Sequence, residues 1–248
     1  MKTLDKKIIG QSSAAVQLKK MIALIAPSDA PAIIYGATGS GKSTIINALC
    51  RFYEINKGDI LFDGQSIKDI NKFDLRKQIA LVQQDVFLFS GKIIDNIRLG
   101  NVQMSQEEIQ SISTAVNSHN FINNFPLKYE QELIEGGGSI SSGQRQLLSF
   151  ARALAVKPQI LVLDEATSSV DMDTERQIKN GIKEMTRGRT SIIIAHRLST
   201  LMHVDKVLVL KNGKIIEFGK RNELLQQRGI FYKLCQAQIK SEQFSTEQ

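Results

Sequence analysis

A glycine-rich loop constrains this chain more than any other feature. Residues 36–44 read Gly-Ala-Thr-Gly-Ser-Gly-Lys-Ser-Thr and follow the apolar run Ala-Ile-Ile-Tyr at 32–35. This is a phosphate-binding loop of the form GxxxxGK[ST], which leads from a strand into a helix. Glycine is needed because the backbone turns tightly and packs close to phosphate oxygens. Successive N–H groups and the positive end of the helix then bind the anion.

Each position of this loop has an expected role. Lys42 should reach the β- and γ-phosphates of a nucleotide, and the Ser43 hydroxyl should ligate Mg²⁺. The alternative is a chance glycine-rich turn, which the surrounding strand, loop and helix disfavour. We therefore expect the loop residues to bind the nucleotide: Gly36, Ala37, Thr38, Gly39, Ser40, Gly41, Lys42, Ser43 and Thr44.

Two acidic residues follow a second apolar strand. The run Ile160-Leu161-Val162-Leu163 ends in Asp164 and Glu165. In open α/β sheets, ligands bind at the carboxyl ends of the strands. Asp164 is expected to hold Mg²⁺ through water, and Glu165 to position and polarise an attacking water. The alternative is a pair of ordinary acids at the start of a helix.

Gln84 and His196 also follow apolar strands, at 79–82 and 190–195. An amide can ligate a metal and sense the γ-phosphate, so Gln84 is a candidate metal ligand. An imidazole with a near-neutral pKa can donate from either nitrogen, so His196 is a candidate γ-phosphate contact. A glutamine or histidine in such a place can equally be a surface or structural residue.

A polar tetrapeptide opens the helical run GQRQLLSFARAL. It consists of Ser141, Ser142, Gly143 and Gln144. Serine at this place can cap a helix. Free hydroxyls at a helix N-terminus can also form an anion site. The tetrapeptide lies far in sequence from the phosphate loop, so it can serve the nucleotide of a partner subunit.

Alternating apolar strands and helices predict a three-layer α/β sandwich with a mainly parallel sheet. A first helix should run from about Lys42 to Phe52. A helical subdomain should be inserted into the sheet, with breaks near 100, 117–124 and 136–138, and Asn212-Gly213 is a hairpin signal. His119 and His203 are expected to be structural or surface residues. Expected boundaries are an N-terminal segment at 1–36, an ATPase core at 37–91 and 158–220, a helical subdomain at 92–157, and C-terminal helices at 221–248.

Composition excludes several classes of protein. The net charge is +7, but the basic residues are scattered, so no nucleic-acid partner is expected. No stretch approaches about 18 consecutive apolar residues, and no apolar segment follows the first residues, so neither a membrane span nor a signal peptide is expected. Cys50 and Cys235 lack metal-ligand spacing and are expected to be buried free thiols. These features indicate a cytoplasmic protein.

From about Ile34 onward, the chain resembles the nucleotide-binding domain of an ATP-binding cassette (ABC) exporter. The resemblance is carried by GATGSGKST, LVQQDVFLFSGKIIDNI, ISSGQRQLLSFARAL, ILVLDEATSSVD, IIIAHRLST and GKIIEFGKRNELL. It implies a P-loop ATPase that uses ATP and Mg²⁺ as a head-to-tail dimer with a second copy or a homologue. It also implies transmembrane partner domains, which place the chain at the cytoplasmic face of a membrane.

The same resemblance assigns further residues. Residues 168–171 would be the dimer-contact loop, Gln84 would face the transmembrane partner, and Glu135 would precede the signature tetrapeptide. Ile140 replaces a usual leucine, Ser142 a usual glycine, and Gln83 stands where proline is common. These departures are mild.

The N-terminus departs from the family more strongly. Such domains usually begin with two antiparallel strands and an aromatic residue that stacks on adenine, yet no aromatic precedes Tyr35. Residues 7–36 instead resemble the start of the AAA+ domain of bacterial enhancer-binding transcription activators. That resemblance implies a helix at about 12–25 and contacts to adenine from Ile8, Ile9 and Gly10. We interpret the chain as a chimera of engineered origin.

Two functions follow. One is an ATP hydrolase of the exporter type. The other is an engineered chimeric P-loop protein that binds ATP but has little or no transport-coupled activity. An AAA+ regulator is disfavoured because the loop that contacts the sigma factor has no counterpart. A DNA-repair cassette ATPase would need a long coiled-coil insertion, which the sequence does not contain.

Overall fold

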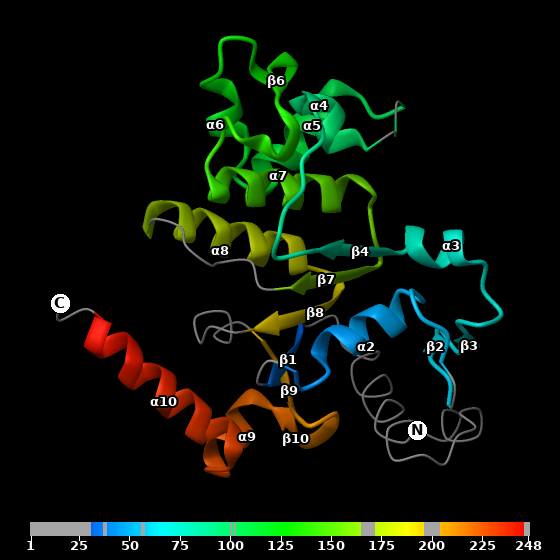
Figure 1. The fold of residues 1–248 in the computed structure, drawn as a ribbon, viewed down its shortest axis with the longest axis vertical. Coiled ribbons are helices and arrows are strands. Elements are labelled where there is room, and N and C mark those ends of the chain that lie inside the picture. Colours follow the sequence, from blue (N-terminus) through cyan, green and yellow to red (C-terminus); the bar gives the residue numbers. More distant parts are fainter. Residues whose placement is uncertain are drawn as a thin grey trace. The chain divides into compact units, whose positions relative to one another are not determined.

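The computed structural model describes residues 31–36, 39–55, 58–99, 101, 103–164, 172–195 and 204–245. The chain divides into two compact units (Figure 1). The first unit comprises residues 1–79 and 190–248, and the second comprises residues 80–189. Each unit is described by itself below. The predicted helix at 12–25 and the residues Ile8, Ile9 and Gly10 lie outside the described residues.

The first unit is built on a buried, mainly parallel set of strands. Strand β1 (Ala32–Gly36) lies between β8 (Thr190–Ala195) and β9 (Lys206–Lys211) and runs parallel to both. β10 (Lys214–Lys220) pairs antiparallel with β9. Parallel strands covered on both faces read as continuous apolar runs, which is why the sequence located β1 and β8 correctly. Asn212 and Gly213 form the predicted hairpin turn between β9 and β10.

The first described helix, α2 (Lys42–Leu49), follows the phosphate loop and ends earlier than the sequence predicts. The expected end was near Phe52. The chain leaves the helical conformation instead, because Arg51 has a positive φ of 52°. The remaining elements of this unit are β2 (Leu61–Phe62), β3 (Gln65–Ser66), α3 (Lys72–Lys77), α9 (Arg221–Gln226) and α10 (Ile230–Ser245).

A glutamate at a bulge in β10 links the sheet to the last helix by hydrogen bonds. The register with β9 shifts between Ile215 and Glu217, and a bulge of this kind changes the direction of a side chain. The Glu217 carboxylate accepts hydrogen bonds from the backbone N–H groups of Ile230 and Phe231. A negative charge stabilises the start of a helix, so Glu217 fixes where α10 begins.

Among the described residues, the second unit contains two longer strands, a pair of two-residue strands and most of the helices. The apolar runs predicted strands β4 (Ile79–Val82) and β7 (Ile160–Asp164) correctly, and the two strands are neighbours in the sheet. The helices α7 (Ser142–Ala155) and α8 (Met172–Thr186) pack against each other. The other elements are β5 (Gly91–Lys92), α4 (Ile93–Arg98), α5 (Gln106–Ala115), α6 (His119–Asn123), η1 (Lys128–Glu130), β6 (Glu132–Leu133) and η2 (Glu135–Gly137).

Two predictions about residues 92–157 were incomplete. The sequence indicated a break at 117–124, but α6 lies inside it. His119 stabilises this region because its ring nitrogens contact the Tyr129 hydroxyl and the Asn123 amide, each at 2.7 Å. The short antiparallel pair formed by β5 and β6 was also missed, because strands of two residues carry no readable periodicity. The structural role that we expected for His119 is confirmed.

Close packing between helices defines the core of the second unit. Phe150 on α7 is completely buried. A Cβ added to Gly181 on α8 would lie 3.2 Å from the Phe150 ring and 3.3 Å from the Val116 carbonyl oxygen. Glycine at this position therefore lets the two helices approach each other.

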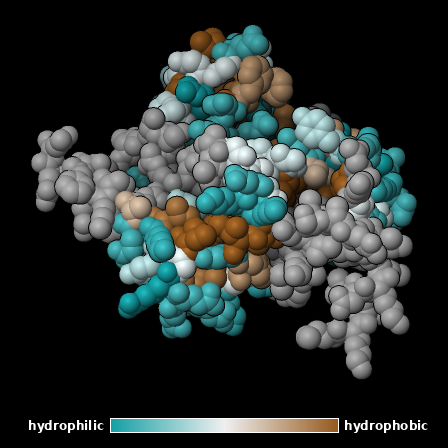
Figure 2. Space-filling view, turned by 60° about the horizontal axis from the view of Figure 1, so that its bottom comes forward, coloured by the Kyte–Doolittle hydropathy of each residue, from teal (hydrophilic) through white to brown (hydrophobic). Residues whose placement is uncertain are grey.

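The two cysteines and the character of the helices agree with the expectations from composition. Cys50 and Cys235 are both free and buried, as predicted. Burial raises the pKa of both thiols. Among the described helices, none combines the length and the apolar character needed to cross a membrane. Figure 2 shows one face of the molecule, where hydrophobic side chains gather in the middle beside hydrophilic ones.

Candidate nucleotide-binding site

The site begins where β1 ends, at Gly36. This glycine is buried, and a Cβ added to it would lie 2.5 Å from the Ser40 hydroxyl oxygen and 2.6 Å from the Leu210 carbonyl oxygen. Both distances are too short for a real side chain. Only glycine therefore allows the phosphate loop to turn back against β1 and β9.

Two further glycines shape the loop by their backbone conformation. Gly39 and Gly41 have φ angles of 78° and 102°, which other residues rarely adopt. Gly41 occupies the N-cap of α2, and no side chain caps this helix start. The start of an α-helix is a common binding place for anions, because its first backbone N–H groups and the positive end of the helix dipole lie there. Ala37 and Thr38 lie outside the described residues.

The polar side chains of the loop differ in their exposure. Lys42 is buried, and its ammonium donates to the Gly36 carbonyl at 2.5 Å. The Ser40 hydroxyl is buried without a hydrogen-bond partner among the described residues. Ser43 and Thr44 are exposed at the start of α2. A bound phosphate would meet a buried cation, exposed hydroxyls and a helix start without a side-chain cap, so the residues fit a nucleotide.

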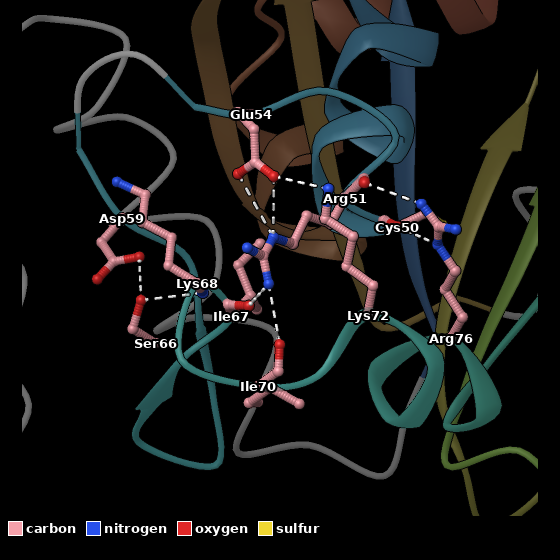
Figure 3. A network of polar contacts seen from close by, with 10 residues as sticks. All are labelled: Cys50, Arg51, Glu54, Asp59, Ser66, Ile67, Lys68, Ile70, Lys72 and Arg76. Carbon is pink, nitrogen blue, oxygen red and sulfur yellow. Dashed lines mark hydrogen bonds and ion pairs between the residues drawn. The ribbon is translucent and has the colours of Figure 1, made fainter.

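Two arginines secure the opposite end of α2 (Figure 3). Arg51 donates to the carbonyls of Ile67 and Ile70 at 2.8 and 2.9 Å. Arg76 donates to the carbonyls of Cys50 and Arg51 at 3.1 and 3.0 Å. The last carbonyls of a helix lack partners within it, and Arg76 supplies donors to the carbonyls of the turn that follows α2. Arg51 joins this turn to the segment between β3 and α3. Sequence patterns do not predict these contacts, because the acceptors are backbone atoms of distant residues.

The expected metal ligands belong to different units. Ser43 begins α2 in the first unit, whereas Gln84 and Asp164 belong to the second. Asp164 is half-buried at the end of β7, and Gln84 is exposed just after β4. A hydroxyl, an amide oxygen and a carboxylate are hard oxygen donors that suit Mg²⁺. Within the described residues, no group of three or more His, Cys, Asp or Glu could hold a metal.

Several predicted residues lie outside the described part of the chain. They include both remaining catalytic candidates and the expected dimer-contact loop: Glu165, His196 and residues 168–171.

The signature tetrapeptide forms a capping box at the start of α7. The Ser141 hydroxyl accepts from the Gln144 N–H at 3.1 Å, and the Gln144 side chain accepts from the Ser141 N–H at 3.1 Å. The predicted cap is therefore confirmed. Ser141 and Ser142 are exposed, whereas Gly143 is buried. Arg145 donates to the carbonyls of Gly137 and Ile140, which ties the preceding loop to the helix.

A second network that the sequence analysis missed links α7 to the segment after Gln84. Arg152 donates to the Phe87 carbonyl at 2.8 Å, and to both the carbonyl and the side-chain oxygen of Asn96. The buried Asn96 in turn donates to the Phe89 carbonyl at 2.9 Å and accepts from the Phe89 N–H at 3.0 Å. A buried Asn inside an apolar helix was the available signal, since such a group must be hydrogen-bonded.

A comparison with protein families identifies the chain. The family model described as ABC transporter matches residues 20–168, more than half of the chain. The chain belongs to the ABC transporter family. The match contains the phosphate loop, the signature tetrapeptide and the strand that ends in Asp164. It begins inside the segment at 7–36 for which the sequence suggested a different origin.

Curated relatives agree with this assignment. The chain is 43% identical over 223 residues to the uncharacterized ABC transporter ATP-binding protein YfiC of Bacillus subtilis, covering 90% of this chain and 37% of that protein. It is 44% identical over 216 residues to a fatty acid ABC transporter ATP-binding/permease protein of Mycobacterium bovis, covering 87% and 34%. The chain thus spans about a third of the length of these relatives.

A solved structure confirms the fold class. A bacterial Atm1-family ABC exporter with ATP bound matches with a TM-score of 0.79 and 36% identity, covering 85% of this chain and 37% of that chain. The predicted α/β P-loop fold with a mainly parallel sheet is therefore confirmed. The chain is an ATP-binding domain of the ABC exporter type, and such domains are ATPases.

The arginine network at the end of α2 yields a first prediction. Arg51 has a side chain that is 15% exposed, and its loss would leave two carbonyls without their donor. Hydrogen bonds that involve a charged group contribute about 1.5–3 kcal/mol. We therefore expect Arg51→Ala to lower the free energy of unfolding by about that amount in urea titrations.

Lys72→Ala is the matched control. Lys72 contacts Glu54, as Arg51 also does, but the side chains of Lys72 and Glu54 are 50% and 56% exposed. Exposed ion pairs contribute little. The control should therefore unfold at nearly the same urea concentration as the parent chain. Equal losses in both variants would show that the carbonyl contacts of Arg51 are not what stabilises this turn.

Proposed function

We propose that this chain hydrolyses ATP to drive an exporter and does so as a head-to-tail dimer. The observation that supports ATP binding most directly is the start of α2. A glycine in the left-handed conformation occupies the N-cap without a side-chain cap, and a buried lysine follows at once. Anions bind at helix starts because backbone N–H donors and the helix dipole act together.

We assign the phosphate contacts as follows. Lys42 binds the β- and γ-phosphates, and the backbone N–H groups from Gly39 to Ser43 surround them. His196 contacts the γ-phosphate from the end of β8. Ser43, Asp164 and Gln84 hold Mg²⁺, which when bound neutralises charge on the phosphate oxygens.

Glu165 acts on the attacking water. A carboxylate directly after Asp164 can accept a proton from water and orient it toward the γ-phosphate. Its position at the carboxyl end of a strand matches the place where ligands bind in such folds.

The dimer explains the signature tetrapeptide. Residues Ser141 to Gln144 of one subunit complete the nucleotide site of a second copy or a homologue. The capping box supports this proposal because it fixes the start of α7 while both serines remain exposed. In this assignment, residues 92–157 form the signature subdomain between the two parts of the ATPase core, 37–91 and 158–220.

The membrane partner is proposed from the relatives. The Mycobacterium bovis protein is named as a joint ATP-binding and permease protein, and this chain spans 34% of it. We infer that transmembrane domains of an exporter contact the chain at the cytoplasmic face of a membrane. The exposed Gln84 is the proposed contact on this chain.

The N-terminal segment supports a second candidate. Residues 1–34 contain no aromatic residue that could stack on adenine. We propose that residues 7–36 derive from an AAA+ domain and that the chain is an engineered chimera, with weak ATP binding and little transport-coupled activity. We place the join within or just before the phosphate loop, the element that both families share, whereas the ABC transporter match already begins at residue 20.

Lys42 provides the test of ATP binding. Lys42→Ala removes a charge that meets the phosphates, and a charge-assisted contact contributes about 1.5–3 kcal/mol. The affinity for ATP with Mg²⁺ should fall about tenfold or more in calorimetry. Lys68→Ala removes the same charge from an exposed lysine that donates to Gly58, and should leave the affinity unchanged. An unaltered affinity of Lys42→Ala would contradict the assignment.

Glu165→Gln separates the two candidate functions. The amide has nearly the same shape but cannot accept a proton from water, so binding should persist and hydrolysis should stop. An exporter-type domain should then accumulate as an ATP-bound dimer, seen as a shift to earlier elution in size-exclusion chromatography. Hydrolysis by the parent chain should rise more than linearly with protein concentration. If the Glu165→Gln variant binds ATP but elutes at the position of the monomer, the result would favour the chimera without transport-coupled activity.

Deletion of residues 1–10 tests the adenine contact. Base–aromatic stacking is worth about 1–3 kcal/mol, and aliphatic contact from Ile8 and Ile9 should replace part of it. We therefore expect the deletion to weaken ATP binding and the parent chain to distinguish ATP poorly from GTP. If the shortened chain binds ATP as tightly as the parent, residues 1–10 do not hold the base.

A further inference from the structure

The turn between β9 and β10 contacts the phosphate loop, although the two are far apart in sequence. The Gly213 N–H donates to the Ser40 carbonyl at 3.0 Å. A Cβ added to Gly41 would lie 3.7 Å from the Gly213 Cα atom. The turn therefore touches the two residues that directly precede Lys42.

Strand register explains this contact. β1 and β9 run parallel, and Gly36 lies opposite Leu210. The carboxyl ends of both strands thus lie at the same edge of the sheet. After Gly36 the chain enters the phosphate loop, and soon after Leu210 it enters the turn. The two segments are neighbours because the sheet places them side by side.

The turn is a rigid support. Asn212 and Gly213 have φ angles of 51° and 69° between two paired strands. Positive φ at both central residues is typical of a type I′ hairpin, whose twist matches that of the flanking strands. A donor carried by such a turn holds its acceptor in a defined place.

The hydrogen bond also fixes the direction of a donor in the loop. In a planar trans peptide, the C=O and the next N–H point to opposite sides. A Ser40 carbonyl held toward the turn therefore directs the Gly41 N–H away from it. That N–H directly precedes Lys42, in the part of the loop that faces the phosphates in our proposed function.

We propose that the Asn212–Gly213 turn is a positioning element of the nucleotide site. It orients the peptide group between Ser40 and Gly41 before the nucleotide arrives. The inference rests on the proposed binding of ATP by the loop. The turn contributes no side chain to the phosphates. Distortion of the turn should lower the affinity for ATP more than it lowers the stability of the fold.

A pair of matched glycines tests the proposal. Gly213 and Gly64 both occupy hairpin turns, with φ angles of 69° and 83°, and a Cβ added to either finds nothing within 4 Å. Gly213→Val and Gly64→Val therefore add similar backbone strain without a clash, but Gly64 has no hydrogen bond to the phosphate loop among the described contacts. Calorimetry with ATP and Mg²⁺ and thermal unfolding are measured on the full chain.

We expect Gly213→Val to weaken ATP binding by about tenfold and Gly64→Val to leave it nearly unchanged, while both lower Tm to a similar extent. Gly213→Asn should largely restore binding, since asparagine tolerates this conformation. Equal affinities in the two valine variants would overturn the proposal. A parent chain that does not bind ATP would overturn the proposed function as well, so the two failures are distinguishable.

Hydrogen exchange of the unaltered chain gives a second measurement that does not depend on a variant folding. Addition of ATP and Mg²⁺ should slow the exchange of amides at 211–214, because an ordered loop holds the Ser40 carbonyl in place. The amides of the control turn at 62–65 should exchange at an unchanged rate. Exchange at 211–214 that does not respond to the nucleotide would also overturn the proposal.

Discussion

The chemistry of the first unit depends on the parallel pairing of β1 with β9. Because Gly36 is opposite Leu210, the end of β1 passes so close to β9 that no Cβ fits between them. The chain has to turn there, and the glycines at 39 and 41 make the turn possible. The phosphate loop is thus shaped by strand packing as much as by its own residues.

Burial of Lys42 gives this geometry an energetic consequence. An ammonium removed from water needs a strong partner, and in this structure the Gly36 carbonyl is one. A triphosphate carries full negative charges and is a better partner than a carbonyl dipole. The loop therefore holds the Lys42 ammonium in a buried position. Replacement of the Gly36 carbonyl by a phosphate oxygen as its partner would favour nucleotide binding. The turn at 212–213 supports the same loop from outside, through a backbone contact.

What the sequence could predict depended on whether the signal was local. The phosphate loop, the buried strands and the cap at Ser141 are contiguous patterns, and all of them appear where expected. The contacts that were missed join backbone atoms to distant residues, as Arg152 does with Phe87 and as Gly213 does with Ser40. Every residue carries a backbone carbonyl, so residue type does not reveal which carbonyl accepts a given hydrogen bond. Such partners can be identified only from the folded structure.

The two helices of the proposed site, α2 and α7, differ in how their N-termini are capped. This difference suggests different roles in binding the nucleotide. α2 begins at a glycine, which provides no side-chain cap. α7 begins with a capping box, so its Gln144 N–H is already satisfied within the chain. A helix start of the first kind binds phosphate strongly by itself. One of the second kind has less to offer an anion, chiefly the helix dipole and exposed hydroxyls. In the proposed head-to-tail dimer, a nucleotide would therefore bind first to the loop of one subunit, and the signature tetrapeptide of the other would add a weaker contact.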